Sequence, residues 1–159
     1  YLYYPSKNQI MPQKPFDQVV ETLISKAEAA LELAYAPYSH FQVAAALLLE
    51  DGTCITGANQ ENAAYPLCMC AERVALYTKA SVHPGLAIEK LVVIARKEGN
   101  QRLIPATPCG ACRQVIAEFE ARQNRPIEMI MLEAIDSWLV VPSAASLLPY
   151  TFTGSNLTA

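Results

Sequence analysis

The chain has 159 residues, of which 52% are hydrophobic and 17% are charged, with a formal net charge of −3. This length suits a single domain with a sizeable core, and the slightly acidic balance excludes a protein that binds nucleic acid through a basic surface. We expect no membrane anchor, because no apolar run approaches the roughly 20 residues of a membrane helix.

The predicted elements follow an N-terminal arm, residues 1–15, which carries three prolines and no hydrophobic period. The first helix is predicted over residues 16–33, with apolar side chains at helical spacing and Asp17 as a cap or a first-turn acid. Two apolar runs then flank Asp51 and Gly52, which is the pattern of a β-hairpin. In chain order the prediction is helix 16–33, strands 41–49 and 53–57, helix 70–79, strand 88–95, helix 109–122, strands 127–132 and 137–141, and a short helical turn within 142–149.

The alternation of helices and apolar strands predicts an α/β fold, in which helices cover both faces of one central sheet. We therefore expect a three-layer α/β/α sandwich with a mixed five-stranded sheet. The link between the last two strands, residues 133–136, is too short for a parallel crossover, so this pair should be antiparallel. No repeat or linker divides residues 16–159, which we expect to form a single domain.

The cysteines gather ahead of two predicted helices, in CMCAERVA at residues 68–75 and PCGACRQ at residues 108–114. Cys70 starts one helix, and Cys109 and Cys112 stand three residues apart at the start of the next, so both can face one side. Helix N-termini carry partial positive charge and lower the pKa of a thiol. Two such ends brought together would offer three thiolates to one Zn²⁺ ion and leave its fourth position for water, which is the catalytic pattern.

Glu72 lies two residues beyond Cys70. A carboxylate beside a metal, but not bound to it, can take a proton from water and pass it to a leaving group. Taken alone, Glu72 is more simply a first-turn acid that complements the helix dipole, but the neighbouring cysteines favour the catalytic role. We also hypothesise that Arg73 donates hydrogen bonds to the cysteine sulfurs. If Cys68 bound the metal as a fourth ligand, the site would instead be closed and structural.

The total of five cysteines is odd, which argues against a disulfide-stapled secreted domain. The N-terminal residues also lack the long apolar core of a signal peptide. These two features predict a cytoplasmic protein with reduced thiols, some of them on a metal. We expect Cys54, which lies in a predicted strand, to be a small core or face residue.

CAE at residues 70–72, followed downstream by PCGAC at residues 108–112, resembles the zinc signature of cytidine deaminases. The resemblance covers most of the chain from Phe16 onward. The stretches that carry it are APYSHFQVAAA (36–46), GANQENAAYPLCMCAERVAL (57–76), TPCGACRQVIAEF (107–119) and LLPYTF (147–152). Together these motifs are specific for the family, and they imply that residues 16–159 form its catalytic domain.

The resemblance implies that Zn²⁺ is held by Cys70, Cys109 and Cys112, and that Glu72 is the acid and base of a hydrolytic deamination. The implied reaction converts cytidine and 2′-deoxycytidine to uridine and 2′-deoxyuridine with release of ammonia, as in pyrimidine salvage. Relatives that act on polynucleotides or on dCMP usually have histidine as the first ligand. Cysteine at this place, with the short link between the last strands, resembles the small homotetrameric enzymes that act on free nucleosides.

The NxEN stretch that begins at Asn59 supplies the expectation for the substrate. By resemblance, Asn59 and Glu61 hydrogen-bond the ribose, mainly its 3′-hydroxyl. Phe41 is expected against the pyrimidine and the sugar. The backbone N–H of Ala71 should bind the base carbonyl oxygen, and the carbonyl of Thr107 should accept from the exocyclic amine. Blasticidin S deaminase, the nearest rival family, shares CAE and PCG-C but lacks the NxEN stretch.

Three aromatic residues are expected at contacts between subunits. By resemblance, Phe152 reaches over the base bound in a neighbouring subunit, and Tyr38 and Tyr65 contribute to subunit contacts at the site. The implied assembly is a homotetramer whose active sites are shared between subunits. Plain core packing is the alternative interpretation of Phe41, Tyr65 and Phe152.

Two departures from the family pattern keep other functions open. The family usually has glycine where this chain has Ala44, so the extra methyl group either crowds the base pocket or is repacked. Cys68 also stands where a non-ligand residue is common. Both features would suit a deaminase of a modified or antibiotic nucleoside. A non-catalytic, zinc-stabilised domain is a further alternative, although a purely structural zinc site needs neither Glu72 nor Asn59.

Overall fold

The computed structural model describes residues 9–12, 16–135 and 137–157. Its helices are α1 (Gln18–Ala30), α2 (Ala71–Val82) and α3 (Gly110–Gln123). Its strands are β1 (Gln9–Pro12), β2 (Phe41–Leu49), β3 (Cys54–Ala58), β4 (Ile88–Lys97), β5 (Leu103–Ile104), β6 (Glu128–Ala134) and β7 (Ser137–Val141). Short 3₁₀ turns cover Leu31–Leu33, Tyr65–Leu67, Ala144–Leu147 and Gly154–Leu157.

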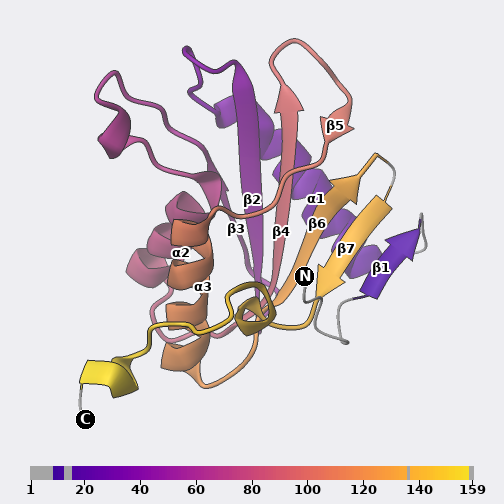
Figure 1. The fold of residues 1–159 in the computed structure, drawn as a ribbon. Helices are drawn as coiled ribbons and strands as arrows, with labels where there is room; N and C mark the ends of the chain where they lie inside the picture. The colour runs from indigo at the N-terminus through magenta and orange to yellow at the C-terminus, as the bar shows by residue number, and fades with distance from the viewer. Residues whose placement is uncertain (1–8, 13–15, 136, 158–159) are drawn as a thin grey trace.

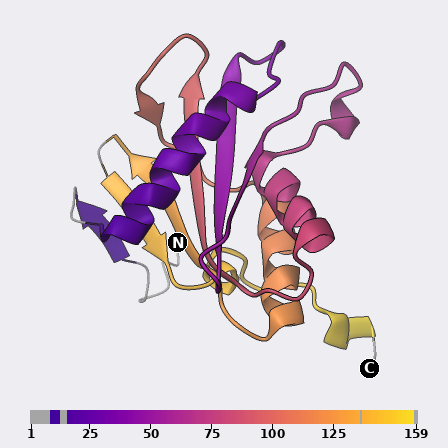
Figure 2. The same cartoon turned by 180° about the vertical axis from the view of Figure 1, so that it is seen from behind.

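One mixed sheet forms the centre of the molecule, with strand order β1-β7-β6-β4-β2-β3 and with β5 paired to β4. Helices α2 and α3 lie side by side on one face of the sheet (Figure 1), and α1 crosses the other face (Figure 2). The expected three-layer α/β/α sandwich is therefore confirmed. Strand β6 is parallel to β4, and the last two strands, β6 and β7, are antiparallel as predicted.

The number of strands differs from the prediction, because the described part of the chain has seven strands rather than five. The two additional strands are short. Strand β1 pairs antiparallel with β7, and β5 pairs over two residues with Ala95 and Arg96 of β4. Backbone pairing with a neighbour defines such strands, and neither offers the four or more alternating residues that reveal a strand in a sequence.

The predicted arm, residues 1–15, thus contributes residues 9–12 to the edge of the sheet. The rest of the arm lies outside the described residues. The division of the chain into an arm and a domain over 16–159 stays a prediction. Within the described part of the chain, none of the helices has the length and apolar content that crossing a membrane requires.

The helix α1 begins and packs as its sequence predicts. The Asp17 side chain accepts a hydrogen bond from the backbone N–H of Val20 at 2.9 Å, which caps the first turn. The buried face of α1 packs on a cluster that includes Ala44, Val92 and Ile94 of the sheet. Ala44 is therefore repacked into the layer between the sheet and α1, on the face opposite to α2 and α3.

The helix α2 lies unusually close to strand β3. A Cβ atom added at Gly57 would come 2.5 Å from the backbone N of Ala75 and 2.6 Å from the backbone O of Ala71. Only glycine permits this approach, because real Cβ contacts do not come within 3.0 Å. The first turn of α2 is thus fixed against the sheet by backbone contact.

The β2–β3 hairpin is also confirmed, since these strands pair antiparallel around the turn at Gly52. Gly52 has φ of 85°, in the left-handed region that glycine adopts without strain.

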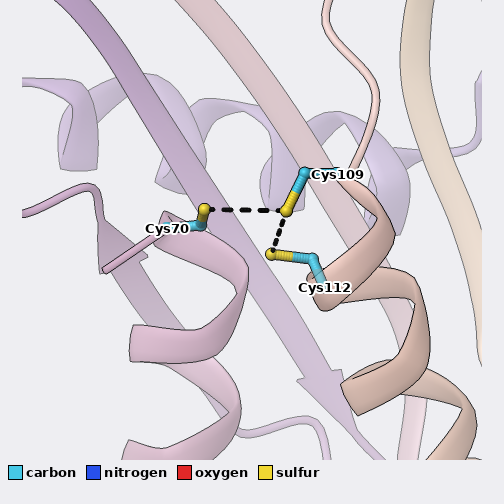
Figure 3. Close-up of side chains that lie close together, drawn as sticks. All are labelled: Cys70, Cys109 and Cys112. Carbon is cyan, nitrogen blue, oxygen red and sulfur yellow. Dashed lines mark hydrogen bonds between the residues drawn. The ribbon is translucent and has the colours of Figure 1, made fainter. Parts of the chain in front are cut away.

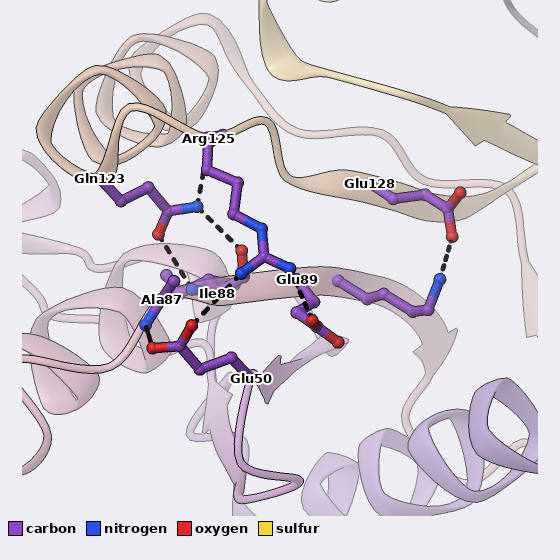
Figure 4. Close-up of polar contacts among 8 residues, drawn as sticks. Glu50, Ala87, Ile88, Glu89, Gln123, Arg125 and Glu128 are labelled. Atoms are coloured by element: carbon purple, nitrogen blue, oxygen red, sulfur yellow. Dashed lines mark hydrogen bonds and ion pairs between the residues drawn. The ribbon is translucent and has the colours of Figure 1, made fainter.

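A network of polar side chains joins α3, β4 and the hairpin at the end of α3 that is remote from its first turn (Figure 4). Arg125 pairs with Glu50 at 3.3 Å and with Glu89 at 2.8 Å. The Gln123 side chain accepts from the N–H of Ile88 and donates to its carbonyl, both at 2.9 Å. These contacts fix the C-terminal end of α3 on the sheet. They thereby help to determine the direction of the helix and the position of its first turn.

Candidate metal centre and active site

The first turns of α2 and α3 bring three cysteine sulfurs together (Figure 3). Cys70 is the N-cap residue of α2, Cys109 is the N-cap residue of α3, and Cys112 lies in the first turn of α3. Cys109 Sγ lies 3.9 Å from Cys70 Sγ and 3.5 Å from Cys112 Sγ. Tetrahedral zinc with Zn–S bonds of about 2.3 Å would hold its sulfurs about 3.8 Å apart, so the observed spacing fits the ion.

The surroundings of the Cys70 sulfur favour negative charge. The pKa of Cys70 is lowered to about 5, mainly because its sulfur accepts a hydrogen bond from the Cys112 thiol, and Arg73 and Cys109 contribute as well. The same contact and burial raise the pKa of Cys112. Arg73 Nη2 lies 3.6 Å from Cys70 Sγ, and Arg73 Nε is buried without a hydrogen-bond partner among the described residues. The guanidinium therefore faces the sulfur group with unused donor capacity.

Among the residues that the structure describes, Cys70, Cys109 and Cys112 form the one group of side chains that could hold a metal ion. Thiolate ligands select soft or borderline metals, of which zinc is the common redox-inert case. Three ligands leave one tetrahedral position open. The donor set, its spacing and the facing Arg73 guanidinium therefore fit zinc in a catalytic rather than a structural site.

Cys68 lies outside this group of sulfurs. Its Sγ accepts from the backbone N–H of Asn62 at 3.2 Å and donates to the Asn62 carbonyl at 3.6 Å. Both contacts hold the thiol on the loop that precedes α2. Cys54, by contrast, is half-buried in β3 against the core under α1, and burial raises the pKa of its thiol. It packs against the edge of this core, which agrees with the prediction of a small core or face residue.

Glu72 lies in the first turn of α2 and is 4% exposed. Burial is the main cause that raises the pKa of its carboxyl group, and the negative charge on Cys70 adds to the effect. A carboxyl group with a raised pKa exchanges protons more readily near neutral pH than an ordinary carboxylate. Glu72 therefore has the environment of a proton carrier beside the metal centre.

A pocket of about 250 Å³ opens beside Cys70 and Cys109. Its lining includes most of the residues that the sequence singled out, namely Phe41, Asn59, Glu61, Cys68, Cys70, Glu72, Thr107 and Cys109. These residues come from β2, from the loop after β3, from the first turns of two helices and from the loop before α3. The fold therefore gathers distant parts of the chain around the metal centre.

The side chain of Asn59 is held by the start of β2. Asn59 Oδ1 accepts from the backbone N–H of Val43 at 2.8 Å, and Asn59 Nδ2 donates to the carbonyl of Phe41 at 2.9 Å. An amide nitrogen has two N–H groups, so one donor of Asn59 is left for a ligand. The Asn59 side chain is thereby fixed beside Phe41 on one wall of the pocket.

The carboxylate of Glu61 is held by the turn that precedes β2. It accepts from the backbone N–H of Tyr38 at 2.9 Å and of Ser39 at 3.3 Å, and from the Ser39 hydroxyl at 2.5 Å. The hydroxyl of Ser39 is the largest cause that lowers the pKa of Glu61, followed by the N–H of Tyr38. Glu61 is therefore an ionised hydrogen-bond acceptor at neutral pH.

Four other residues named from the sequence do not line the pocket. Ala71 is the first residue of α2, so its N–H has no partner within the helix and can serve a ligand. Phe152 is 58% exposed and does not line the pocket of its own chain, and its carbonyl accepts from Gln114 Nε2 at 2.8 Å. The rings of Tyr38 and Tyr65 meet edge to face at 5.9 Å, and both remain exposed.

Two polar residues near the site were missed in the sequence. Ser39 binds Glu61, 22 residues away, and Arg113 donates to the carbonyls of Pro108 at 2.8 Å and Leu147 at 3.0 Å. Arg113 thereby ties the loop before Cys109 to the C-terminal segment. The contact of Ser39 with Glu61 and that of Arg113 with Leu147 have no local sequence signal, because only the fold brings these partners near.

Residues 17–125 match the family model described as the cytidine and deoxycytidylate deaminase zinc-binding region. The protein named cytidine deaminase from Sporosarcina psychrophila is 44% identical over 138 residues, which cover 87% of this chain and 94% of that protein. The cytidine deaminase of Halalkalibacterium halodurans is 41% identical over 86% of this chain and 96% of its own length.

Solved structures agree with these relatives. The crystal structure of cytidine deaminase from Burkholderia pseudomallei matches with a TM-score of 0.70 and 39% identity, over 83% of this chain and 98% of that chain. The enzyme from Mycobacterium tuberculosis matches with a TM-score of 0.65 and 30% identity, over 87% of this chain and 98% of that chain. Sequence and fold together show that the chain belongs to the cytidine deaminase family of zinc-binding deaminases.

Proposed function

We propose that this chain catalyses the hydrolytic deamination of cytidine and 2′-deoxycytidine, with uridine or 2′-deoxyuridine and ammonia as products. The observation that carries the proposal is one pocket that combines two kinds of group. Glu72 lies buried close to the sulfurs, and Asn59 and Glu61 offer polar groups to the same pocket. The names of the relatives support the same activity.

The proposed reaction assigns the proton transfers to Glu72. Zinc held by Cys70, Cys109 and Cys112 would supply an activated water molecule as the nucleophile. Glu72 takes one proton from that water and delivers it to ring N3 while the water oxygen bonds to C4. Glu72 then moves the remaining proton of the new hydroxyl group to the amine, the C4–N bond breaks, and ammonia leaves.

The other pocket residues bind and orient the nucleoside. Phe41 packs against the pyrimidine and the sugar, and the N–H of Ala71 and the carbonyl of Thr107 hold the carbonyl oxygen and the amine of the base. Asn59 and Glu61 hydrogen-bond the ribose. A site with a fixed acceptor for a sugar hydroxyl discriminates against ligands that lack this group, because the buried polar atoms would be left unpaired.

We further infer that the active form is a homotetramer in the cytoplasm. The exposed side chains of Tyr38, Tyr65 and Phe152 support subunit contacts, since large exposed aromatic groups are common at interfaces. Phe152 does not reach its own pocket and is available to the pocket of a neighbour. The separated monomer is therefore expected to be a poor enzyme.

A deaminase of a modified nucleoside is the second candidate, and only Cys68 favours it, because this thiol lines the pocket. Ala44, the other feature that suggested this candidate, does not support it, since Ala44 packs on the α1 side of the sheet. The buried Glu72 argues against a non-catalytic zinc domain. Burying a carboxyl group costs free energy, and a purely structural zinc site does not need this group.

The direct test is the change in ultraviolet absorbance when zinc-loaded protein is mixed with cytidine, 2′-deoxycytidine and a panel of modified cytidines. Steady conversion of the first two, faster than of any modified base, is the expected result. Conversion of only a modified base would favour the second candidate. No conversion of any member, with zinc bound and the oligomer intact, would contradict an enzymatic function.

A further inference from the structure

The turn before β2 carries a serine whose hydroxyl connects two residues of the pocket. Ser39 Oγ donates to Glu61 Oε1 at 2.5 Å and accepts from the backbone N–H of Phe41 at 3.1 Å. Glu61 and Phe41 both line this pocket. One hydroxyl group therefore links the carboxylate and the aromatic residue that are proposed to meet the sugar.

The hydrogen bonds on Glu61 leave it room for a ligand. An ionised carboxylate offers about four acceptor positions on its two oxygens. Tyr38 and Ser39 donate their N–H groups to Oε2, and the Ser39 hydroxyl donates to Oε1. Oε1 thus keeps an acceptor position while the rotamer of the side chain is fixed. A fixed acceptor loses less conformational entropy on binding than a freely rotating one.

We propose that Ser39 is a positioning residue for the ribose of the substrate, acting through Glu61 and Phe41. Without its hydroxyl, Oε1 loses the one donor that it has among the described residues, and the described contacts that remain hold the carboxylate through Oε2. The hydroxyl of the sugar then meets an acceptor that is less well oriented. This inference rests on the proposed function, because it names the part of the nucleoside that Ser39 governs.

The first experiment compares Ser39→Ala and Ser39→Thr with the parent enzyme. We expect Ser39→Ala to raise KM for cytidine about three- to tenfold with kcat within about twofold, since loss of uniform binding affects KM alone. Ser39→Thr keeps the hydroxyl and should restore KM to within about twofold of the parent. An unchanged KM in Ser39→Ala would overturn the inference.

The chain offers a matched control in a second contact between a serine and a glutamate. Ser143 Oγ donates to Glu120 Oε2 at 2.9 Å, and Glu120 Oε1 accepts from the N–H groups of Ile127 and Ala144 at 2.8 and 2.9 Å. The chemistry is the same, but none of these residues lines the pocket beside the sulfurs. Ser143→Ala should leave KM for cytidine unchanged, and an equal rise in both variants would indicate general loosening and overturn the role of Ser39.

The second experiment removes the sugar group instead of the serine. With 3′-deoxycytidine, Ser39→Ala should change KM less than twofold relative to the parent, because the hydroxyl that Glu61 accepts from is absent. A rise as large as that seen with cytidine would mean that Ser39 does not act on the sugar, which overturns the inference.

The third measurement separates this inference from the proposed reaction. Calorimetric titration of the parent and of Ser39→Ala with uridine needs no turnover. We expect uridine to bind about three- to tenfold more weakly to the variant. Uridine binding that is unchanged in the variant, or absent in the parent, overturns the inference whatever the rate of deamination, whereas a parent that binds uridine but leaves cytidine intact fails the proposed function alone.

Discussion

Two carboxylates of the same pocket, Glu72 and Glu61, lie in opposite environments. Glu72 is 4% exposed, and burial raises the pKa of its carboxyl group. Glu61 is partly exposed, and hydrogen bonds from Ser39 and Tyr38 lower the pKa of its carboxyl group. Groups of one chemical type whose pKa values are displaced in opposite directions are suited to different tasks.

The difference separates a proton carrier from a fixed acceptor. A proton carrier must bind and release a proton, and a raised pKa brings that exchange closer to neutral pH. A fixed acceptor must stay ionised and keep its direction, which the donors on Glu61 ensure. This difference supports the proposal that Glu72 serves the chemical step and Glu61 binds the sugar.

The supports of the two carboxylates differ as well. Glu72 is carried by the first turn of α2, which backbone contact with Gly57 fixes on the sheet. Glu61 is carried by a loop, and side-chain hydrogen bonds from the neighbouring turn hold it. Substitutions that disturb the contact between α2 and the sheet should therefore lower the rate of catalysis. Substitutions that disturb the turn holding Glu61 should weaken substrate binding.

Loss of the metal should have the largest effect on the rate of deamination, because the proposed reaction needs the water that zinc activates. We expect Cys112→Ser to bind zinc weakly and to deaminate cytidine no faster than the solution without enzyme. Removal of zinc from the parent by a chelator should give the same loss, and added zinc should reverse it only in the parent. Full activity in the zinc-free parent would contradict the metal centre.

Substitution of the proton carrier should have the next largest effect. We expect Glu72→Gln to lower kcat about 10²- to 10⁴-fold, the usual contribution of a general acid and base. Zinc content by elemental analysis and the melting temperature should stay close to those of the parent, because the amide has the same shape. A variant that keeps zinc and also keeps its kcat would contradict the role of Glu72.

Substitution of the fixed acceptor should change the other kinetic parameter. We expect Glu61→Gln to raise KM for cytidine about 10- to 100-fold, as loss of a hydrogen bond to a charged group implies. The value of kcat should stay within about threefold of the parent. Steady-state kinetics over a wide range of cytidine concentrations measures KM and kcat separately. A fall in kcat with unchanged KM would place Glu61 in the chemical step instead.

The support of α2 can be tested at Gly57. The methyl group in Gly57→Ala would collide with the backbone of Ala71 and Ala75, so we expect a loss of about 1–3 kcal/mol in the free energy of unfolding. Urea unfolding measures this loss. Gly85→Ala is a suitable control, because a Cβ atom there meets nothing within 4 Å. Equal stability of the two variants would show that the approach of α2 to β3 is not tight.

The smallest expected effect is on the contribution of Glu61 to the stability of the protein at acidic pH. A carboxyl group whose pKa is lowered by folding stabilises the protein above its ordinary pKa of 4.5, and this contribution is lost as the pH falls through the lowered pKa. The difference in unfolding free energy between the parent and Glu61→Gln should therefore be constant above about pH 5.5 and shrink below pH 4.5. A difference that grows on acidification would have the wrong sign.

The layers of the fold were predictable because they rest on long apolar segments. The hairpin at Gly52, the three helices and the antiparallel final pair are all encoded by local patterns and a short link. Strands β1 and β5 were not predictable, since two to four residues beside a proline or in a loop carry no periodic signal. Their pairing depends on β7 and β4, which the sequence alone does not bring alongside.

The candidate site was predictable to the extent that it is local in sequence. Cys70 and Glu72 share one helical turn, and Cys109 and Cys112 share another, so spacing alone indicates that the members of each pair lie near each other. Ser39 was not predictable, because a serine in a turn usually bonds its own backbone and nothing local points to Glu61. The burial of Glu72, which distinguishes it from Glu61, likewise follows from packing and not from its position.

The most direct test of this division of roles is to measure kcat and KM for cytidine in Glu72→Gln and Glu61→Gln side by side, with zinc content matched. We expect Glu72→Gln to lose kcat without a rise in KM, whereas Glu61→Gln should show a raised KM and keep its kcat. If both substitutions lower kcat to the same extent and leave KM unchanged, the two carboxylates do not have separate roles and the account is wrong.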